Sequence, residues 1–427
     1  EVMKAICDKS ADFIYTDEST FMGSIEKGSP NYKPDFSPDT LRSYNYICHF
    51  SIFSRSLLLL VGKFKSEFDG SQDYDMILRL TEKAQKIVHI PMTLYYWRIH
   101  QSSASANLAM KPKVINAAKN AIRQHLDRIG LCGSVEDSTL ISTYRIKYQI
   151  IDNPLISIII PNKDHVEDLE KCINSILKVT TYSNYEIIVV ENGSTENITF
   201  DYYDELQNRY PNIEIIHWDG SFNFSAINNY GFRYSKGKYV LLLNNDMEVI
   251  SSDWLQEMLM FAQRKDVGVV GAMLYYPDNT IQHAGVILGI GGFAGHSHKH
   301  FRRGDYGYMG RLTLAQNLSA VTGACMLIPR HAFEEVHGLD DSFAVALNDV
   351  DFCMRIRKAG YLIVFTPYAE LYHYESKSRG YEDTPEKQKR FEREVFRFQK
   401  RWSKELAAGD PYYNPNLTLE KEDFSVK

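Results

Sequence analysis

The chain has 427 residues, of which 44% are hydrophobic and 24% are charged, as is typical of a soluble globular protein with two or three domains. The formal net charge of −6 and the lack of a long basic block argue against a nucleic-acid-binding protein. The six cysteines form no CxxC pair, which argues against a zinc ribbon and favours reduced thiols in the cytosol. No apolar run predicts a membrane span or a signal peptide.

The first third of the chain predicts a mixture of helices and strands. Residues 1–11 have a short helical pattern, and DFIYTDES predicts a strand that ends at the acidic Asp17 and Glu18. GSQDYDMILRLTEKA predicts a turn and a helix, IVHIP a strand, residues 111–129 a helix, and the polar GSVEDST a linker. Because the chain begins at Glu1 without methionine and inside a helical pattern, we expect it to be a fragment of a longer protein.

From about Pro154, strands and helices alternate. Four buried strands are predicted, in PLISIIIPNKD, YEIIVVENGS, IEIIHWDG and KYVLLLNND, with helical segments between them. This alternation predicts βαβ units in a doubly wound, mostly parallel sheet. Ligands bind such sheets outside the carboxyl ends of the strands, so we expect a pocket among residues 161–164, 191–195 and 244–246. No GxGxxG or Walker loop follows the first strand, which argues against a dinucleotide dehydrogenase or a P-loop enzyme.

An internal repeat relates the two parts of the chain. Residues 54–91 align with residues 330–367 without a gap, and this alignment pairs glycine, aspartate, arginine and proline residues. The aligned pairs are Gly62 with Gly338, Asp73 with Asp349, Asp75 with Asp351, Arg79 with Arg355 and Pro91 with Pro367. The first copy has no counterpart of the strands from Pro154 onward, so it corresponds to the second half of a domain only.

The order of several motifs resembles a known enzyme family. SIIIPNKD, IIVVENGS, AINNYGFRYSKGKYVLLLNND, VTGACMLI, NDVDFCMRIRKAG and LYHYES follow one another as in family 2 glycosyltransferases of the GT-A fold. QHAGVILGIGG, NFSAINNYG and DPYYNPNL resemble the tandem glycosyltransferases of bacterial O-antigen, capsule and rhamnan assembly. The resemblance implies a truncated C-terminal half of a first domain in residues 1–106, a helix and linker in 107–153, and a complete GT-A domain in 154–383. An amphipathic helix and tail are expected in residues 384–427.

The resemblance also implies a divalent cation, Mg²⁺ or Mn²⁺. Charge builds on the leaving diphosphate as the glycosidic bond breaks, and a hard cation with oxygen ligands stabilises it. The family supplies such ligands from a DxD motif, which here reads Asn244, Asn245, Asp246. Asp246 is therefore the implied metal ligand, and the alternative is that it belongs to a helix-capping turn. His373 in LYHYES matches the position of a second ligand, and the alternative is a histidine of an aromatic cluster.

An inverting transferase needs a general base for the acceptor hydroxyl. Asp349 occupies the family position of that base, at the start of the helix DVDFCMRIRKAG, and a plain first-turn carboxylate is the alternative. Asp351 is expected to cap the helix or to bind Arg355. Asp73 stands at the matching position of the first copy, which we expect to be inactive because it lacks a nucleotide-binding half.

Several further residues match positions that contact the nucleotide sugar in the family. We expect base and ribose contacts from the first strand and its loop, a base contact at the end of the second strand, and donor contacts from the helix and loop around LLLNND. These residues are Pro161, Asn162, Asp164, Glu191, Asn229, Asn244 and Asn245, with Arg233 or Lys236 as further diphosphate contacts. Trp218, Phe222 and Phe224 could stack on sugar or base, or pack in the core.

Two remaining patterns allow alternatives. His296, His298 and His300 alternate, so on a strand they would share a face, which could suit a transition metal; the resemblance instead places this loop by the acceptor cleft. Residues 384–406 carry apolar side chains at helical spacing among many charges, which predicts an amphipathic helix. Packing on the domain is the simpler interpretation, and peripheral contact with a membrane is the other.

The leading hypothesis is a metal-dependent, inverting glycosyltransferase that moves a sugar from a nucleotide-sugar donor to a glycan or lipid-linked glycan acceptor of a bacterial surface polysaccharide. We expect it in the cytoplasm, at the inner face of the plasma membrane. The alternatives are a catalytically silent glycan-binding or scaffold module, suggested by the incomplete DxD motif, and a nucleotidyltransferase, against which the absence of a glycine- and lysine-rich loop argues.

Overall fold

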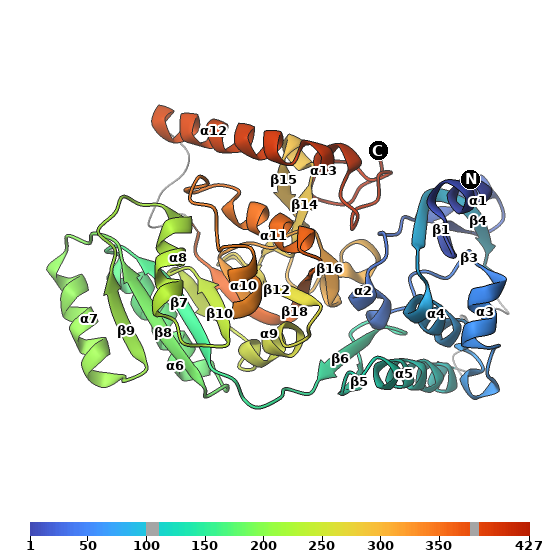
Figure 1. Ribbon diagram of the computed structural model, residues 1–427, viewed down its shortest axis with the longest axis horizontal. Coiled ribbons are helices and arrows are strands. Elements are labelled where there is room, and N and C mark those ends of the chain that lie inside the picture. Colours follow the sequence, from blue (N-terminus) through green and yellow to red (C-terminus); the bar gives the residue numbers. More distant parts are fainter. Residues whose placement is uncertain (100–110, 376–383) are drawn as a thin grey trace.

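The computed structural model describes residues 1–99, 111–375 and 384–427, which form two units joined by a helix and a hairpin (Figure 1). The first unit is residues 1–99 and the second is residues 154–375. The joining segment consists of α5 (Lys111–Arg128), β5 (Gly133–Asp137) and β6 (Tyr144–Tyr148). The domain boundaries expected near residues 106 and 383 lie outside the described residues. No helix in the described ranges is long and apolar enough to cross a membrane.

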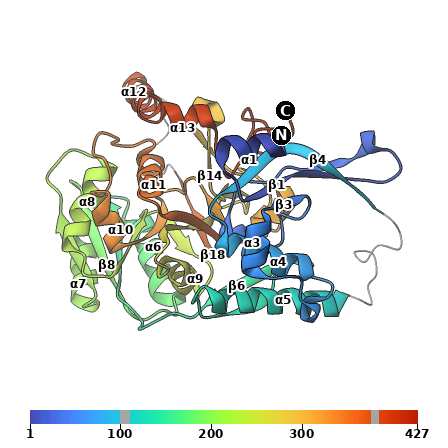
Figure 2. The same cartoon turned by 45° about the vertical axis from the view of Figure 1, so that its right-hand side comes forward.

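The first unit is a four-stranded sheet with helices beside it (Figure 2). The long strands β1 and β4 run parallel, and β2 and β3 pair antiparallel with β1. Its elements are α1 (Val2–Lys9), β1 (Phe13–Phe21), β2 (Ser29–Asn31), α2 (Pro38–Ser43), β3 (Ser51–Phe53), α3 (Arg55–Val61), α4 (Gln72–Lys83) and β4 (Ile87–Arg98), with 3₁₀ turns at Ile25–Lys27 and Ser66–Phe68.

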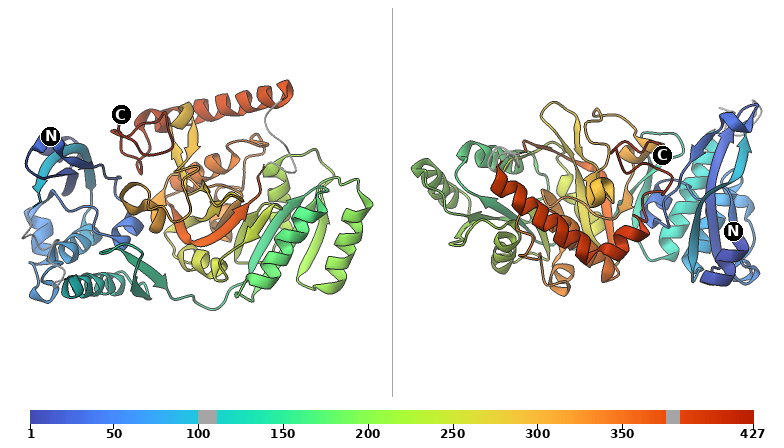
Figure 3. Two further views of the ribbon diagram at one scale, coloured as in Figure 1. Left: turned by 180° about the vertical axis from the view of Figure 1, so that it is seen from behind. Right: turned by 90° about the horizontal axis from the view of Figure 1, so that it is seen from above.

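The second unit is built on a ten-stranded sheet, seen from behind and from above in Figure 3. Strands β9, β8, β7 and β10 are parallel neighbours, β17 runs antiparallel between β10 and β12, and β12 is parallel to β18. In chain order the elements are β7 (Ile156–Asn162), α6 (Val166–Val179), β8 (Tyr185–Glu191), α7 (Asn197–Arg209), β9 (Ile213–His217), α8 (Phe224–Tyr234), β10 (Tyr239–Leu243), β11 (Met247–Val249), α9 (Trp254–Ala262), β12 (Val267–Tyr275), β13 (Ile281–His283), β14 (Val286–Leu288), β15 (Ala294–His296), β16 (Gln316–Leu318), β17 (Cys325–Pro329), α10 (Arg330–Glu335), α11 (Asn348–Lys358) and β18 (Leu362–His373), with 3₁₀ turns at Ile290–Gly292 and Tyr308–Thr313.

The continuous apolar runs of the central strands arise because helices cover both faces of the sheet. Ile158 of β7 and Leu241 of β10 belong to one core with residues of α6 and α9. Their chain neighbours Ile159 and Leu242 point the other way, into a second core with residues of α8, α10 and α11. The expected doubly wound sheet is therefore present, with β17 as an antiparallel insertion.

The geometry of the first unit parallels that of β12 to β18. In both places an antiparallel strand, a short helix and a longer helix lie in the chain between a strand and its later parallel neighbour. The longer helices, α4 and α11, begin at aligned positions. Arg79 bonds Asp75 and the carbonyl of Gly62, as Arg355 bonds Asp351 and the carbonyl of Gly338. The expected Asp351–Arg355 pair is thus present. One difference is that β17 also pairs with β10, whereas the other edge of β3 has no strand partner among the described residues.

A buried ionic joint connects the two units through α2. The carboxylate of Asp39 bonds Arg264, which follows α9, and lies 3.1 Å from Arg42. Asn317 of β16 donates to the same carboxylate at 2.8 Å. Burial opposes the charge of Asp39, but the two guanidinium groups hold its pKa down at about 2. The joint therefore rests on a charged aspartate that is almost inaccessible to solvent.

One expectation about the first 150 residues is wrong. Asp17 and Glu18 do not end a strand: β1 continues to Phe21, and both carboxylates are buried, with Lys33 and His89 among their partners. The polar GSVEDST stretch, expected to be a linker, lies in the segment that joins the two units, but residues 133–137 form the strand β5, whose partner is β6. Only Val135 of β5 is buried, so the strand carries too little apolar alternation to be recognised.

The predicted C-terminal amphipathic helix is present but broken. It consists of α12 (Pro385–Arg401) and α13 (Ser403–Ala408), and α12 lies across the second unit (Figure 3). Trp402, between the two helices, donates from its indole nitrogen to Asp351 at 2.9 Å, and Phe398 is fully buried. The tail that follows reaches the first unit, where Asn414 donates to Asp17 at 2.9 Å.

Candidate active site

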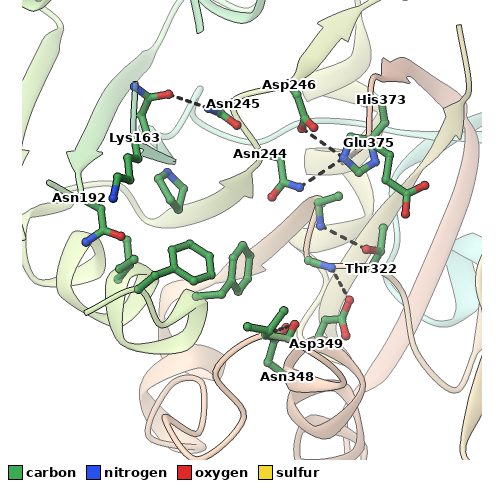
Figure 4. A pocket seen from close by; sticks show the side chains of 18 of the residues that line it. Lys163, Asn192, Asn244, Asn245, Asp246, Thr322, Asn348, Asp349, His373 and Glu375 are labelled. Atoms are coloured by element: carbon green, nitrogen blue, oxygen red, sulfur yellow. Dashed lines mark hydrogen bonds and ion pairs between the residues drawn. The ribbon is translucent and has the colours of Figure 1, made fainter. Parts of the chain in front are cut away.

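A pocket of about 430 Å³ opens where β7 and β10 end, between these strands and α11 (Figure 4). Its lining comes mainly from the loops after β7, β8 and β10, the turn before β17, the start of α11 and the end of β18. Helix α8 and strands β13 and β15 also contribute. The lining residues are Pro161, Asn162, Lys163, Asp164, His165, Asn192, Phe222, Phe224, Ile227, Asn244, Asn245, Asp246, Gln282, His296, Thr322, Gly323, Ala324, Val345, Asn348, Asp349, His373 and Glu375. The pocket thus lies at the carboxyl ends of the parallel strands.

One corner of the pocket holds Asp246 and His373. Asp246 follows β10, and His373 ends β18; β11, which follows Asp246, pairs with β18 and brings the two together. Asp246 Oδ1 lies 3.2 Å from His373 Nε2. The side-chain amide of Gln282 lies 2.7 to 2.9 Å from His373 Nδ1 and holds the ring in this orientation. Asn244 Nδ2 lies 3.3 Å from the same Nε2 atom.

Asp349 lies in a second corner, at the start of α11. Its Oδ1 accepts the backbone N–H of Val350 at 2.8 Å, and its Oδ2 accepts that of Gly323 at 2.9 Å. A carboxylate is also favoured in the first turn of a helix by the helix dipole. Gly323 must approach closely, because a Cβ there would lie 3.4 Å from Asp349 Cβ and 3.3 Å from the Phe224 ring. The carboxylate is therefore fixed in one orientation toward the pocket.

A third side of the pocket is formed by polar side chains after β7 and β10. Asn245 donates to Asn162 at 2.6 Å, and this bond ties the ends of the two neighbouring strands together. Asp164 accepts the backbone N–H groups of Thr195 and Glu196 at 2.8 and 3.0 Å. Burial raises the pKa of Asp164, but these bonds together lower it below its usual value. Figure 4 shows Lys163 and Asn192 on this side, across the pocket from His373.

Of the residues expected to contact the nucleotide, the structure brings Pro161, Asn162, Asp164, Asn244 and Asn245 to the pocket. Glu191 and Asn229 lie outside its lining. The Glu191 carboxylate accepts from Ser194 and from the Tyr203 hydroxyl, and the Asn229 amide bonds Leu339 and Asp341. Both side chains therefore hold loops in place. Arg233 and Lys236 are also outside the lining.

Sequence reasoning assigned no role to Gln282, Glu375, Thr322 or Gly323. Gln282 contacts His373 and also donates to Glu375 at 3.0 Å. Burial raises the pKa of the Glu375 carboxyl, but the bond from Gln282 and the neighbouring His373 together lower it below its usual value. The other two act through backbone N–H groups. The motifs QHAGV and VTGAC, which contain Gln282, Thr322 and Gly323, could have pointed to these residues. A residue type does not reveal the role of its backbone N–H group, however.

The three alternating histidines do not share a face. Only His296 lies on a strand, at the end of β15, whereas His298 and His300 have positive φ angles. The His298 ring stacks on Phe424 and the His300 ring on Tyr276. Among the described residues no group of three or more histidine, cysteine, aspartate or glutamate side chains could hold a metal ion. The transition-metal alternative for this loop therefore has no support in the geometry.

Comparison with known families matches residues 157–337 to the profile described as glycosyl transferase family 2. Residues 157–337 belong to glycosyl transferase family 2. The matched range of this family 2 domain contains Asp246 but ends before Asp349 and His373. The match and the topology of the ten-stranded sheet confirm the expected GT-A class of fold.

Two relatives match nearly the whole chain. An uncharacterized protein, y4gI, of Sinorhizobium fredii is 46% identical over 97% of this chain and 46% of its own length. The O-antigen biosynthesis protein RfbC of Myxococcus xanthus is 36% identical over 97% of this chain and 32% of its own length. The chain thus spans less than half of the length of either relative. Among solved structures, the mannosyltransferase PcManGT from Pyrobaculum calidifontis, in complex with GDP-Man and Mn²⁺, matches with a TM-score of 0.41 and 16% identity over 54% of this chain and 59% of its own.

Proposed function

We propose that the family 2 domain transfers a sugar from a nucleotide-sugar donor to a glycan acceptor, with inversion at the anomeric carbon and with the help of a divalent cation. The observation that carries this proposal is the arrangement of one pocket. The Asp246–His373 pair occupies one corner, Asp349 another, and the ends of β7 and β10 form the remaining side (Figure 4). A donor, its metal and an acceptor could meet there.

The first corner suits a metal ion such as Mg²⁺ or Mn²⁺. Gln282 engages His373 Nδ1, and the Nε2 atom of His373 faces the Asp246 carboxylate at 3.2 Å. An imidazole nitrogen and a carboxylate oxygen are both suitable ligands, and the imidazole favours Mn²⁺. When bound, the cation would neutralise the diphosphate leaving group. Because Asn244 and Asn245 carry no charge, diphosphate oxygens and water would complete its coordination.

The donor nucleotide is proposed to lie along the ends of β7 and β10. Pro161, Asn162 and Asp164 would contact the base and ribose, and Asn244 and Asn245 the sugar diphosphate. The hydrogen bond from Asn245 to Asn162 supports this placement because it holds the ends of β7 and β10 side by side, where one ligand could contact both. Lys163 also lines the pocket and adds a cation that a diphosphate could approach.

Asp349 is the proposed general base. It would take the proton of the acceptor hydroxyl as that oxygen attacks the anomeric carbon from the side opposite the diphosphate, which inverts the configuration. Two backbone N–H bonds hold its carboxylate still, which favours catalysis by positioning. Asp73 has the matching bond to Tyr74 N–H in the first unit, but it is not among the residues that line the pocket described above.

The name of the Myxococcus relative suggests the wider setting. We propose that the acceptor is a growing bacterial surface polysaccharide, free or lipid-linked, and that the enzyme works in the cytoplasm at the inner face of the plasma membrane. One side of α12 supports such a contact, since Phe396 is exposed there and basic residues outnumber acidic ones. The charged residues beside it are Lys389, Arg393, Arg397, Lys400, Glu386 and Glu392. The first unit is proposed to be the C-terminal half of another transferase domain, as its shared geometry with β12 to β18 suggests.

Donor and metal binding provide the test. Thermal unfolding would be followed with UDP, GDP and dTDP, and with their sugars, with and without Mn²⁺, for the wild type and for Asp246→Ala. We expect one nucleotide to raise the wild-type midpoint in a Mn²⁺-dependent way and the variant to lose that dependence. Glu248→Ala is a matched control, since it removes a carboxylate two residues away that contacts Tyr374 and lies outside the pocket lining. If no nucleotide shifted the midpoint, a silent glycan-binding module would be favoured, and pyrophosphate release from a nucleoside triphosphate would indicate a nucleotidyltransferase.

A further inference from the structure

Two histidines lie in contact at the pocket that holds the proposed base. His283, at the end of β13, is fully buried, whereas His296, at the end of β15, is half-buried and lines the pocket. Their Nδ1 atoms are 3.0 Å apart, and the rings meet edge to face with centroids 5.1 Å apart. At that distance one Nδ1 atom must carry a hydrogen and the other must accept it.

The backbone decides which histidine is the donor. The N–H of Thr322 donates to His283 Nε2 at 3.3 Å, so this nitrogen carries a lone pair. A neutral His283 then holds its hydrogen on Nδ1 and donates it to His296 Nδ1. The hydrogen of His296 is therefore on Nε2, at the opposite edge of the ring. Burial lowers the pKa of both histidines, which favours the neutral forms that this chain of bonds requires.

The same turn positions both His283 and the proposed base. Thr322 N–H bonds His283, and the next N–H, of Gly323, bonds Asp349 Oδ2. Asp349 and His296 both line the pocket. A neutral imidazole with its hydrogen on Nε2 can donate a hydrogen bond from that atom, but its Nδ1 lone pair is already engaged by His283, so it cannot accept the acceptor proton.

We propose that His296 is an acceptor-binding residue whose Nε2–H holds an oxygen of the acceptor sugar next to Asp349, and that His283 and Thr322 act as positioning groups that fix its tautomer. The inference rests on the proposed function and deepens it. It separates the two roles at this end of the pocket: Asp349 takes the proton, and His296 only orients the acceptor.

Matched substitutions test this role. The amide nitrogen of glutamine can replace an imidazole Nε2–H, whereas phenylalanine keeps the ring shape without a donor. With p-nitrophenyl glycosides that the wild type accepts, His296→Phe is expected to lower kcat/KM for the acceptor about 10- to 100-fold, in line with the loss of one hydrogen bond. His296→Gln should remain within a few-fold of the wild type. The KM for the donor and the nucleotide-induced thermal shift should be unchanged in both variants.

A spectroscopic readout tests the arrangement apart from turnover. Long-range ¹H–¹⁵N spectra at neutral pH should show His283 protonated at Nδ1 and His296 at Nε2, and His283→Phe should release His296 from that single tautomer. Equal losses in His296→Gln and His296→Phe, a loss in donor binding, or an Nδ1-protonated His296 would overturn this inference. A wild type that bound no nucleotide would instead overturn the proposed function.

Discussion

Replacing Asp349 by asparagine tests the proposed base most directly. General-base catalysis contributes about 10²- to 10⁴-fold to a rate, which corresponds to about 3 to 5 kcal/mol in activation free energy. Asparagine can still accept the Val350 N–H through Oδ1, but its amide nitrogen would face the Gly323 N–H that now lies 2.9 Å from Oδ2. Two opposed donors cost about 1 to 3 kcal/mol of folding stability. We therefore expect a folded, somewhat less stable protein with kcat reduced at least 100-fold.

The chain provides a matched control for this substitution. Asp73 occupies the same position at the start of α4 and likewise bonds the next backbone N–H, that of Tyr74, at 2.9 Å. Asp73→Asn should leave transfer unchanged. The assay is the initial rate of acceptor-dependent release of nucleoside diphosphate, with donor binding followed by thermal shift. A folded Asp349→Asn protein that retained transfer within about threefold of the wild-type rate would refute the assignment of Asp349 as the base.

Two further predictions concern the joint between the units and the C-terminal helix. Asp39→Asn should lower the free energy of unfolding by about 3 to 5 kcal/mol at neutral pH, because it leaves Arg264 and Arg42 facing a neutral group in a buried site. Since the pKa of Asp39 is about 2 when folded and near 4 when unfolded, about 2.5 kcal/mol of this stabilisation is present above about pH 4 and is lost as the pH falls through 2. The difference between the urea titrations of both proteins should therefore narrow by that amount in acid, and a constant difference would contradict the assignment. For α12, the double substitution Lys389→Glu and Arg393→Glu should abolish co-sedimentation with phosphatidylglycerol vesicles, since each basic residue contributes about 1 kcal/mol at an anionic surface. The control is the double substitution Lys63→Glu and Lys65→Glu on the first unit. Equal effects of the two pairs would argue against a specific contact of α12.

The strands of the second unit could be predicted because their apolar runs are a local property. The run that ends at Leu243 specifies both the buried strand β10 and the point at which polar side chains can reach a pocket. The sequence alone did not identify partners that come from far along the chain. Glu191 has the position of a base-binding residue, yet its carboxylate accepts a hydrogen bond from the hydroxyl of Tyr203. From the sequence, Asp17 is expected at the polar end of a strand. In the structure its carboxylate is buried and bonds His89 and Asn414, which come from far along the chain.

Part of the lining of the candidate site could be predicted from residue types. Asp246 and Asp349 are side chains whose chemistry is visible in their residue type, and the structure brings both to one pocket. Gly323 acts through its backbone N–H, and the tautomer of His296 depends on a chain of bonds through His283 to Thr322. Such roles depend on register and distance, which residue types do not reveal.

The edge of β3 that has no strand partner among the described residues affects how this chain will behave at high concentration. An open strand edge offers unpaired N–H and C=O groups to any other extended segment. Here the exposed side chains of Leu59 and Leu60, on the helix that directly follows β3, add apolar surface close by in the chain. Intermolecular β-pairing at this edge, promoted by those leucines, is the expected route of aggregation, and a partner segment that supplied one more strand would suppress it.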